Sequence, residues 1–263
     1  MKQHLVRFSA LLLLLVFGTA GCGGCAKRWD LLSGEEQATL RRILTHWEKW
    51  VPAKRKNGTA PLVDFPELYA GLGIEEQVFL DRVRSINPKK SFSFKGSHFG
   101  KPPEGIHFKR VARQIVIRKG KREKLDPQYL PEKVYGAYEQ MMKKMKQDLG
   151  KRLLIDSGYR SPAYQLYTFL YYLPKHHYSL VETGHWIALP GYSEHGAPQQ
   201  QAIDFINEQG INGEDNVEEF AVLPEYEWLL RHAQEFGFEL SYPRWKKGIT
   251  FEPWHWRYIG QKA

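Results

Sequence analysis

Apolar residues recur at helical spacing in two stretches of the N-terminal half, which predicts two helices there. The first begins after Ser33, where a Ser-x-x-Glu pattern provides a capping box, and it ends near Pro52. Residues 53–61 carry charge, Gly and Pro and predict a loop. The second helix is expected over residues 66–86. Its apolar face consists of Val78, Phe79, Val83 and Ile86.

The C-terminal half mixes helical patterns with short apolar runs. The helices are expected at residues 131–149, 162–172 and 225–236. Strands are expected at residues 153–155, 238–242 and 249–251, with a hairpin after 114–117 and loop and strand over 184–204. Because no βαβ rhythm joins these elements, we predict an α+β fold. It would have a small, mostly antiparallel sheet with flanking helices, and a mainly helical N-terminal extension.

The first 21 residues resemble a secretory signal. Lys2 and Arg7 form a basic start, and the apolar run at residues 8–20 is shorter than the roughly 20 residues of a membrane-spanning helix. Small residues before Cys22 resemble a lipoprotein cleavage site, so acylation of Cys22 and a lipid anchor are expected. The alternative is ordinary secretion, in which Cys22 and Cys25 are incidental.

Composition narrows the classes of partner. The chain has two cysteines, both close to the signal, so the folded part has no disulfide and depends on core burial for stability. Its formal net charge of +9 falls to +7 when Lys2 and Arg7 are removed. No nucleic-acid-binding motif accompanies this charge, so we expect no nucleic-acid partner. The basic residues suit anionic surfaces of the cell envelope, or they form a solvated face.

We divide the chain into three parts. Residues 1–21 are expected to be the signal, residues 22–125 the anchor, linker and N-terminal extension, and residues 126–263 a domain that carries the candidate catalytic residues given below, which we call the enzyme domain. The extension could recognise glycan, gate the cleft or brace the domain. The expected location is the cell envelope, lipid-anchored to a membrane and facing the periplasm or cell exterior, as a monomer.

Two pairs of histidine and carboxylate residues carry the chemistry. Glu252 lies three residues before His255, and Glu194 and His195 precede Asp204. Two imidazoles, one Asp and a separate Glu are the components of a catalytic zinc site. Such a site has three protein ligands, an open position for water and a base that accepts the water's proton. We therefore predict a zinc site in a cleft on the sheet.

Four motifs surround these residues. They are Ser157-Gly158-Tyr159-Arg160-Ser161 with Gln165, Leu189-Pro190-Gly191-Tyr192-Ser193-Glu194-His195, Ala202-Ile203-Asp204, and Glu252-Pro253-Trp254-His255-Trp256-Arg257-Tyr258-Ile259-Gly260. Together they resemble the bacterial D-alanyl-D-alanine carboxypeptidases of the vancomycin-resistance type. That family belongs to a wider group with the lysostaphin-type peptidases and the hedgehog domain. The resemblance covers roughly residues 126–260.

The resemblance implies a role for each motif. Zn2+ would be bound by His195, Asp204 and His255, and Glu252 would be the general base and acid. Arg160 would stabilise the oxyanion or hold the terminal carboxylate of the substrate, unless it forms a structural ion pair. Further contacts to the substrate are implied for Ser193, Gln165, Tyr159 and Trp254.

This sequence departs from the family between the first two ligands. The segment from His195 to Asp204 is two residues longer than the family usually has. The extra residues are expected to bulge at the turn, or else to alter the cleft mouth or the metal position.

The expected function is removal of the C-terminal D-amino acid from peptidoglycan stem peptides. L,D-carboxypeptidase or endopeptidase activity on the same polymer is an alternative. A non-catalytic peptidoglycan-binding protein with this fold is another.

Overall fold

The computed structural model describes residues 30–92, 94–100 and 103–260. The signal segment, Cys22 and Cys25 lie outside the described residues, and so do the predictions made for them. None of the described helices is both long enough and apolar enough to span a bilayer.

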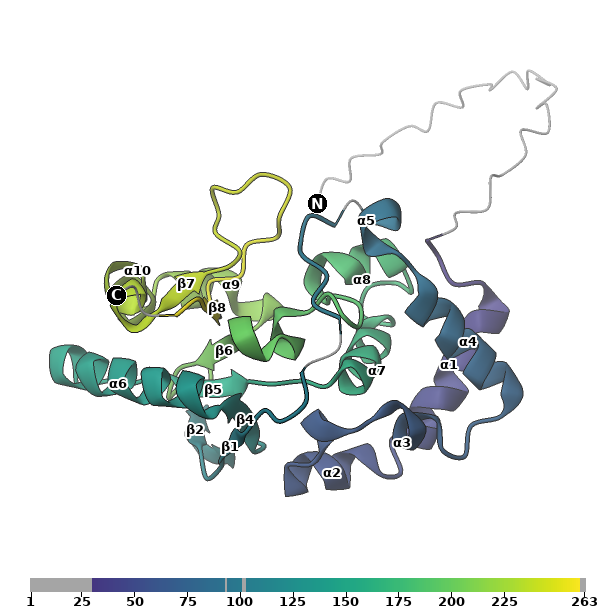
Figure 1. The fold of residues 1–263 in the computed structure, drawn as a ribbon, viewed down its shortest axis with the longest axis horizontal. Helices are drawn as coiled ribbons and strands as arrows, with labels where there is room; N and C mark the ends of the chain where they lie inside the picture. Colours follow the sequence, from purple (N-terminus) through teal and green to yellow (C-terminus); the bar gives the residue numbers. More distant parts are fainter. Residues whose placement is uncertain (1–29, 93, 101–102, 261–263) are drawn as a thin grey trace, which may run out of the picture.

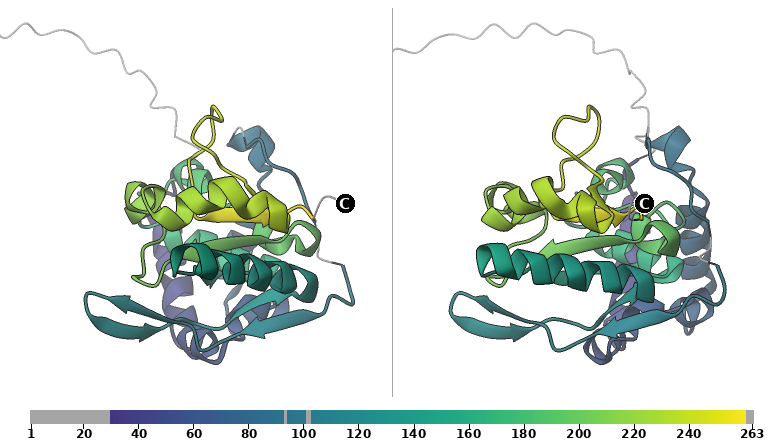
Figure 2. Two further views of the ribbon diagram at one scale, coloured as in Figure 1. Left: turned by 90° about the vertical axis from the view of Figure 1, so that its left-hand side faces the viewer. Right: turned by 60° about the vertical axis from the view of Figure 1, so that its left-hand side comes forward.

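A four-stranded antiparallel sheet forms the centre of the C-terminal part (Figure 1). Its strands are β5 (Leu154–Ser157), β6 (Ala202–Ile206), β8 (His255–Tyr258) and β7 (Phe238–Leu240), in that order across the sheet. Helices α6 (Glu132–Leu149) and α10 (Pro224–His232) lie side by side against the sheet (Figure 2). The predicted α+β fold with a small antiparallel sheet is confirmed.

Helix α6 illustrates why the sequence folds in this way. Its apolar face lies in the core shared with the sheet and α10, and Met141 and Met145 are fully buried there. Gly150 follows the helix in the left-handed conformation, with φ of 70°, which suits a residue without a side chain. The remaining short elements of this part are η4 (Glu214–Asn216), α9 (Val217–Ala221) and η5 (Ala233–Phe236).

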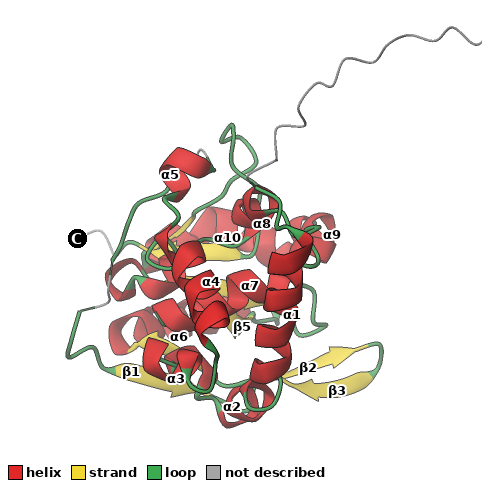
Figure 3. Cartoon of the chain, turned by 90° about the vertical axis from the view of Figure 1, so that its right-hand side faces the viewer, coloured by secondary structure: helices red, strands yellow, loops and turns green. Residues whose placement is uncertain are grey.

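The N-terminal extension is helical, as predicted. It contains α1 (Gly34–Trp47), α2 (Val51–Asn57), η1 (Ala60–Leu62), α3 (Phe65–Tyr69), α4 (Ile74–Ser85) and α5 (Pro88–Ser91). Its apolar residues share a second core with α7 (Pro162–Tyr172) and α8 (Leu180–Trp186). Figure 3 shows α1 and α4 in front of α7. The extension therefore packs on the enzyme domain through α7.

Two antiparallel ribbons connect the extension to α6. Strand β1 (Phe108–Val111) pairs with β4 (Gln128–Pro131), and β2 (Ile115–Arg118) pairs with β3 (Lys121–Lys124). The second ribbon is the predicted hairpin, with Lys119 and Gly120 at positive φ in its turn.

Several local predictions were wrong. Residues 53–61 are not a loop, because Pro52 lies in the first turn of α2, where a proline has no amide hydrogen bond to lose. Val78 is 61% exposed, whereas Leu80 is fully buried and occupies the inner face of α4 instead. Residues 249–251 form part of a loop rather than a strand, and the helix α8 had not been predicted.

Candidate active site

Strand register brings two of the predicted ligands together. Asp204 on β6 lies directly opposite His255 on β8, and it pairs on its other side with Ser157 of β5. Opposite residues of an antiparallel pair project from the same face of the sheet, so Asp204 and His255 meet there. His195 comes from the turn η2 (Glu194–Gly196), which precedes β6.

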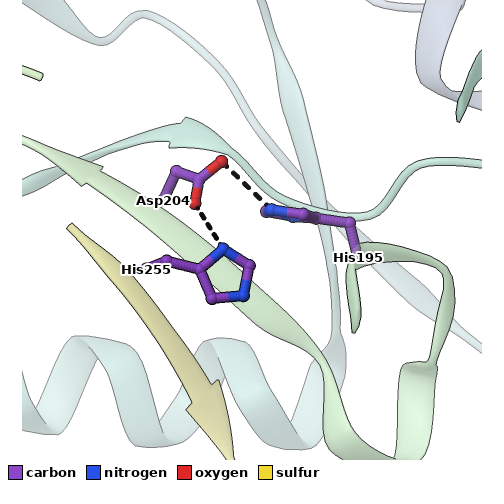
Figure 4. Close-up of side chains that lie close together, drawn as sticks. All are labelled: His195, Asp204 and His255. Carbon is purple, nitrogen blue, oxygen red and sulfur yellow. Dashed lines mark hydrogen bonds and ion pairs between the residues drawn. The ribbon is translucent and has the colours of Figure 1, made fainter. Parts of the chain in front are cut away.

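Hydrogen bonds to the outer nitrogen of each imidazole fix the two rings. Nδ1 of His195 donates to the carbonyl of Gly158 at 2.7 Å, and Nε2 of His255 donates to the carboxylate of Glu194 at 3.0 Å. Each ring therefore directs its other nitrogen at Asp204. Nε2 of His195 lies 3.0 Å from one Asp204 oxygen, and Nδ1 of His255 lies 2.9 Å from the other (Figure 4).

This arrangement fits a divalent cation. The ligand atoms of His195, Asp204 and His255 all lie within 4.8 Å of one another. Nε2 of His195 is buried and makes no hydrogen bond within the described structure. With both outer nitrogens protonated, two imidazole lone pairs face carboxylate oxygens, so a proton or a cation is needed between them. These three residues could hold such a cation.

The environment sets the protonation of the three groups. Burial and the charge of Arg160 lower the pKa of His195 to about 4, so its ring is neutral and able to bind a cation. Burial opposes ionisation of Asp204, but the two histidines hold its pKa below the usual range. Burial also acts against protonation of His255, yet Asp204 and Glu194 together raise its pKa to about 10.

Glu194 is a site residue that sequence reasoning did not assign. It is 8% exposed, and one carboxylate oxygen accepts hydrogen bonds from Ser241 at 2.5 Å and from His255. The other oxygen accepts from Arg257 at 3.1 Å. Although burial raises the pKa of Glu194, these partners lower it to about 2. The only signal in the sequence was its position beside His195.

The predicted base, Glu252, lies beside the ligands without being one of them. One of its carboxylate oxygens is 3.7 Å from Nδ1 of His255, and its side chain makes no hydrogen bond with any described residue. The residue is 9% exposed and lines the cleft. Burial, and to a smaller extent the charge of Asp204, raises its pKa to about 8, although His255 acts in the opposite direction.

Arg160 also faces this cleft. Its backbone amide donates to the carbonyl of His195 at 3.0 Å, which places the residue next to the ligand turn. Its Nε is buried, and the guanidinium forms neither a hydrogen bond nor an ion pair with a described residue. The structural ion pair considered from the sequence is therefore absent from the described part of the chain.

The other four candidates differ in placement. Ser193 and Trp254 line the cleft, and Ser193 caps the ligand turn by accepting from the amide of His195. Gln165 is buried on α7 and is not among the residues that line the cleft. Its side chain donates to the carbonyl of Ala188. Tyr159 also lies outside that lining and packs against Phe108, with ring centroids 4.4 Å apart. Substrate contacts by these four residues stay predictions.

The cleft has a volume of about 930 Å³ and is lined by both parts of the chain. The enzyme domain contributes the three ligands, Glu252 and Arg160, among others, whereas the extension contributes Arg55 and residues 60, 61, 92, 94–97 and 99. Between the first two ligands, the chain forms the turns η2 and η3 (Pro198–Gln200). The ligand atoms converge across these turns, and an insertion relative to the family stays a prediction.

Comparison with known proteins identifies the family of this chain. A family model described as VanY, D-alanyl-D-alanine carboxypeptidase, matches residues 127–261, about half of the chain. The chain belongs to this family. The matched region contains β5 to β8 and all the residues proposed for catalysis.

Individual relatives are more distant. The protein YodJ of Bacillus subtilis (strain 168) is 31% identical over 147 residues, which are 54% of this chain and 50% of YodJ. A D-alanyl-D-alanine carboxypeptidase of Enterococcus faecalis (strain ATCC 700802 / V583) is 39% identical over 86 residues, 32% of this chain and 28% of that protein. The chain thus spans no more than half the length of these two relatives.

Solved structures with similarity include the LdcB LD-carboxypeptidase, at 26% identity and a TM-score of 0.45 over 57% of this chain and 69% of that one. Another is a mutant of the vancomycin resistance D,D-pentapeptidase VanY in complex with Zn(II). It is 21% identical, with a TM-score of 0.44 over 64% of this chain and 88% of that one.

Proposed function

We propose that this protein is a zinc-dependent carboxypeptidase that removes the C-terminal D-amino acid from peptidoglycan stem peptides. The observation that supports this most directly is the convergence of His195, Asp204 and His255 beside the carboxylate of Glu252. Membership of the VanY family supports the peptidase class.

Two imidazole nitrogens and a carboxylate oxygen form a donor set that suits Zn2+ with one position left open. Zinc held there would supply Lewis-acid polarisation of the scissile carbonyl and would lower the pKa of water toward neutrality. Glu194 and the carbonyl of Gly158 would orient the two histidines, as outer partners of metal ligands commonly do.

The side chains around the ligands would carry the proton transfers. Glu252 would accept a proton as water attacks the peptide carbon, and it would pass that proton to the amine that leaves as the C–N bond breaks. A buried carboxyl group with its pKa raised to about 8 suits a group that both takes up and releases a proton near neutral pH. Arg160 would bind the developing oxyanion or the terminal carboxylate.

A digest of defined muropeptides by the zinc-loaded protein, analysed by mass spectrometry, tests this proposal. Loss of one residue from a stem ending in D-Ala-D-Ala is the expected result. Trimming of a tetrapeptide stem alone would indicate L,D-cleavage, and release of monomers from crosslinked dimers would indicate an endopeptidase. Retention of peptidoglycan without any cleavage would favour the non-catalytic binding protein.

We also propose a location in the cell envelope, with the protein attached to a membrane through a lipid on Cys22. This proposal depends on the basic start, the apolar run and the small residues before Cys22. Membrane fractions of cells producing the Cys22→Ser variant should lose the protein, while the Cys25→Ser control keeps it. Equal retention of both variants would contradict the anchor.

A further inference from the structure

One wall of the cleft is formed by four tyrosines of α7, which we call the tyrosine face: Tyr164, Tyr167, Tyr171 and Tyr172. They follow one side of the helix. The other side is buried in the second core and consists of Ala163, Leu166, Phe169 and Leu170. Because α7 already has an apolar side for the core, Tyr164, Tyr171 and Tyr172 are not needed to pack the helix, whereas Tyr167 also packs against this core.

The rings of the tyrosine face are arranged in a series. Tyr164 and Tyr167 are stacked with ring centroids 5.4 Å apart and an interplanar angle of 10°. Tyr167 and Tyr171 are stacked at 5.8 Å, and Tyr171 meets Tyr172 edge to face at 5.7 Å. The fully buried Trp47 of α1 meets Tyr167 edge to face, with ring centroids 5.6 Å apart. The series is therefore held in place before any ligand arrives.

The hydroxyl groups of the tyrosine face are free to bind a ligand. None of the four makes a hydrogen bond with a residue in the described part of the chain, although a partly buried tyrosine usually finds a partner. Tyr171 is 51% exposed, whereas the other three are partly buried. The face thus combines aromatic carbon with several unused donors and acceptors along one wall.

Charged residues from the extension and the following segment extend this wall. Arg55 of α2 and Asp126 form an ion pair at 2.9 Å and line the same cleft. The charges of Arg55 and Arg160 both act on Tyr164, whose pKa is raised mainly by burial. The tyrosine face therefore adjoins Arg160 of the proposed active site and the helical extension.

We propose that the tyrosine face binds the sugar rings of the glycan strand while the attached stem peptide reaches the metal ligands. A pyranose ring presents apolar C–H groups on its faces and hydroxyls at its edges, which matches exposed aromatic carbon with free phenol groups. At about 930 Å³ the cleft is near the upper end of the usual range for ligand sites, roughly 300–1,000 Å³. This inference rests on the proposed function, because it takes the substrate to be a polymer in which sugar and peptide are joined.

The kinetic test compares two substrates that carry the same pentapeptide, with and without the N-acetylglucosamine–N-acetylmuramic acid disaccharide. In the unaltered protein the disaccharide should raise kcat/KM. Tyr171→Ala should reduce the ratio of kcat/KM between the two substrates by about fivefold to tenfold. Tyr171→Phe should remove only the part due to the hydroxyl. The control Tyr135→Ala, which changes a partly exposed tyrosine of α6 outside the cleft, should keep the advantage.

A binding measurement separates this inference from the proposed function. A titration of the full chain with β-1,4-linked N-acetylglucosamine tetramer, followed by NMR, should show binding that Tyr171→Ala weakens and Glu252→Gln leaves intact. If no substrate is hydrolysed but the tetramer binds in this way, the carboxypeptidase proposal fails and the glycan site stands. If both substrates are hydrolysed but the disaccharide gives no advantage, or if Tyr171→Ala slows hydrolysis of both substrates equally, the glycan site is refuted.

Discussion

Glu194 accepts a hydrogen bond from Nε2 of His255 at 3.0 Å, although the two residues are 61 positions apart in the sequence. This contact fixes the ring of His255 so that Nδ1 faces Asp204. Glu194 is itself held by Ser241 and Arg257, so the orientation of a proposed ligand depends on residues from three separate segments.

The first prediction concerns this contact. Replacing Glu194 by Gln should weaken zinc binding about 10-fold to 100-fold, because an amide orients the imidazole less firmly and lowers its basicity. Competition with a chromogenic chelator measures the affinity directly and does not require activity. Glu239→Gln is the matched control, since Glu239 pairs with Arg257 and does not touch His255. Equal affinities in all three proteins would show that Glu194 does not position the ligand.

The second prediction concerns Glu252. The Glu252→Gln variant should retain one zinc ion per chain while kcat falls by about 10²-fold to 10⁴-fold, because the amide cannot accept the proton of the attacking water. Metal content and single-turnover hydrolysis of a pentapeptide would be measured on the same sample. Unchanged turnover with zinc present would assign the base to another group.

The third prediction concerns the protons released by metal binding. Without a metal, Asp204 and Glu194 raise the pKa of His255 to about 10, so this ring carries an extra proton at neutral pH. His195 is already neutral above its pKa of about 4. Binding of zinc should therefore release about one proton from His255 and up to one more from Glu252, whose pKa is about 8 without the metal, so the affinity should rise at least tenfold per pH unit between pH 6 and 8.

Calorimetry in two buffers with different ionisation enthalpies counts these protons. An affinity that is independent of pH over this range would mean that His255 is neutral before the metal binds.

The fourth prediction compares two glycines. A Cβ atom at Gly158 would collide with the backbone carbonyl of Tyr129, and Gly158 also supplies the carbonyl that orients His195. Gly158→Ala should lower the free energy of unfolding by about 1–3 kcal/mol through overpacking, and it should weaken zinc binding as well. In contrast, Gly136 lies within α6, and a Cβ atom added there would meet no other atom within 4 Å.

Gly136→Ala should raise the free energy of unfolding by about 0.4–1 kcal/mol, because alanine loses less backbone entropy in a helix. Urea titrations of both variants provide the comparison. If the two substitutions had the same effect, the close approach of Gly158 to Tyr129 would not be a constraint on the fold.

The sequence alone determined the elements whose own periodicity or capping is strong. Helix α7 spans the predicted residues, with Pro162 at its first position, and the Lys119–Gly120 turn forms the expected hairpin. The His195, Asp204 and His255 set was also visible, because few combinations of residue types and neighbours suit a catalytic metal. Such local signals need no knowledge of the partners in space.

Tertiary structure decided what each side chain contacts. The sequence predicted a helix over residues 162–172, but only the fold places the N-terminal extension against one side of α7 and leaves the tyrosines lining the cleft. Gln165 was part of a motif, yet it is buried, donates to the carbonyl of Ala188 and is not among the residues that line the cleft. Glu194 orients His255 because the folded chain places strand β8 beside it. Contacts between distant positions depend on how the strands and helices assemble, and the pattern of residues along one segment does not predict this assembly.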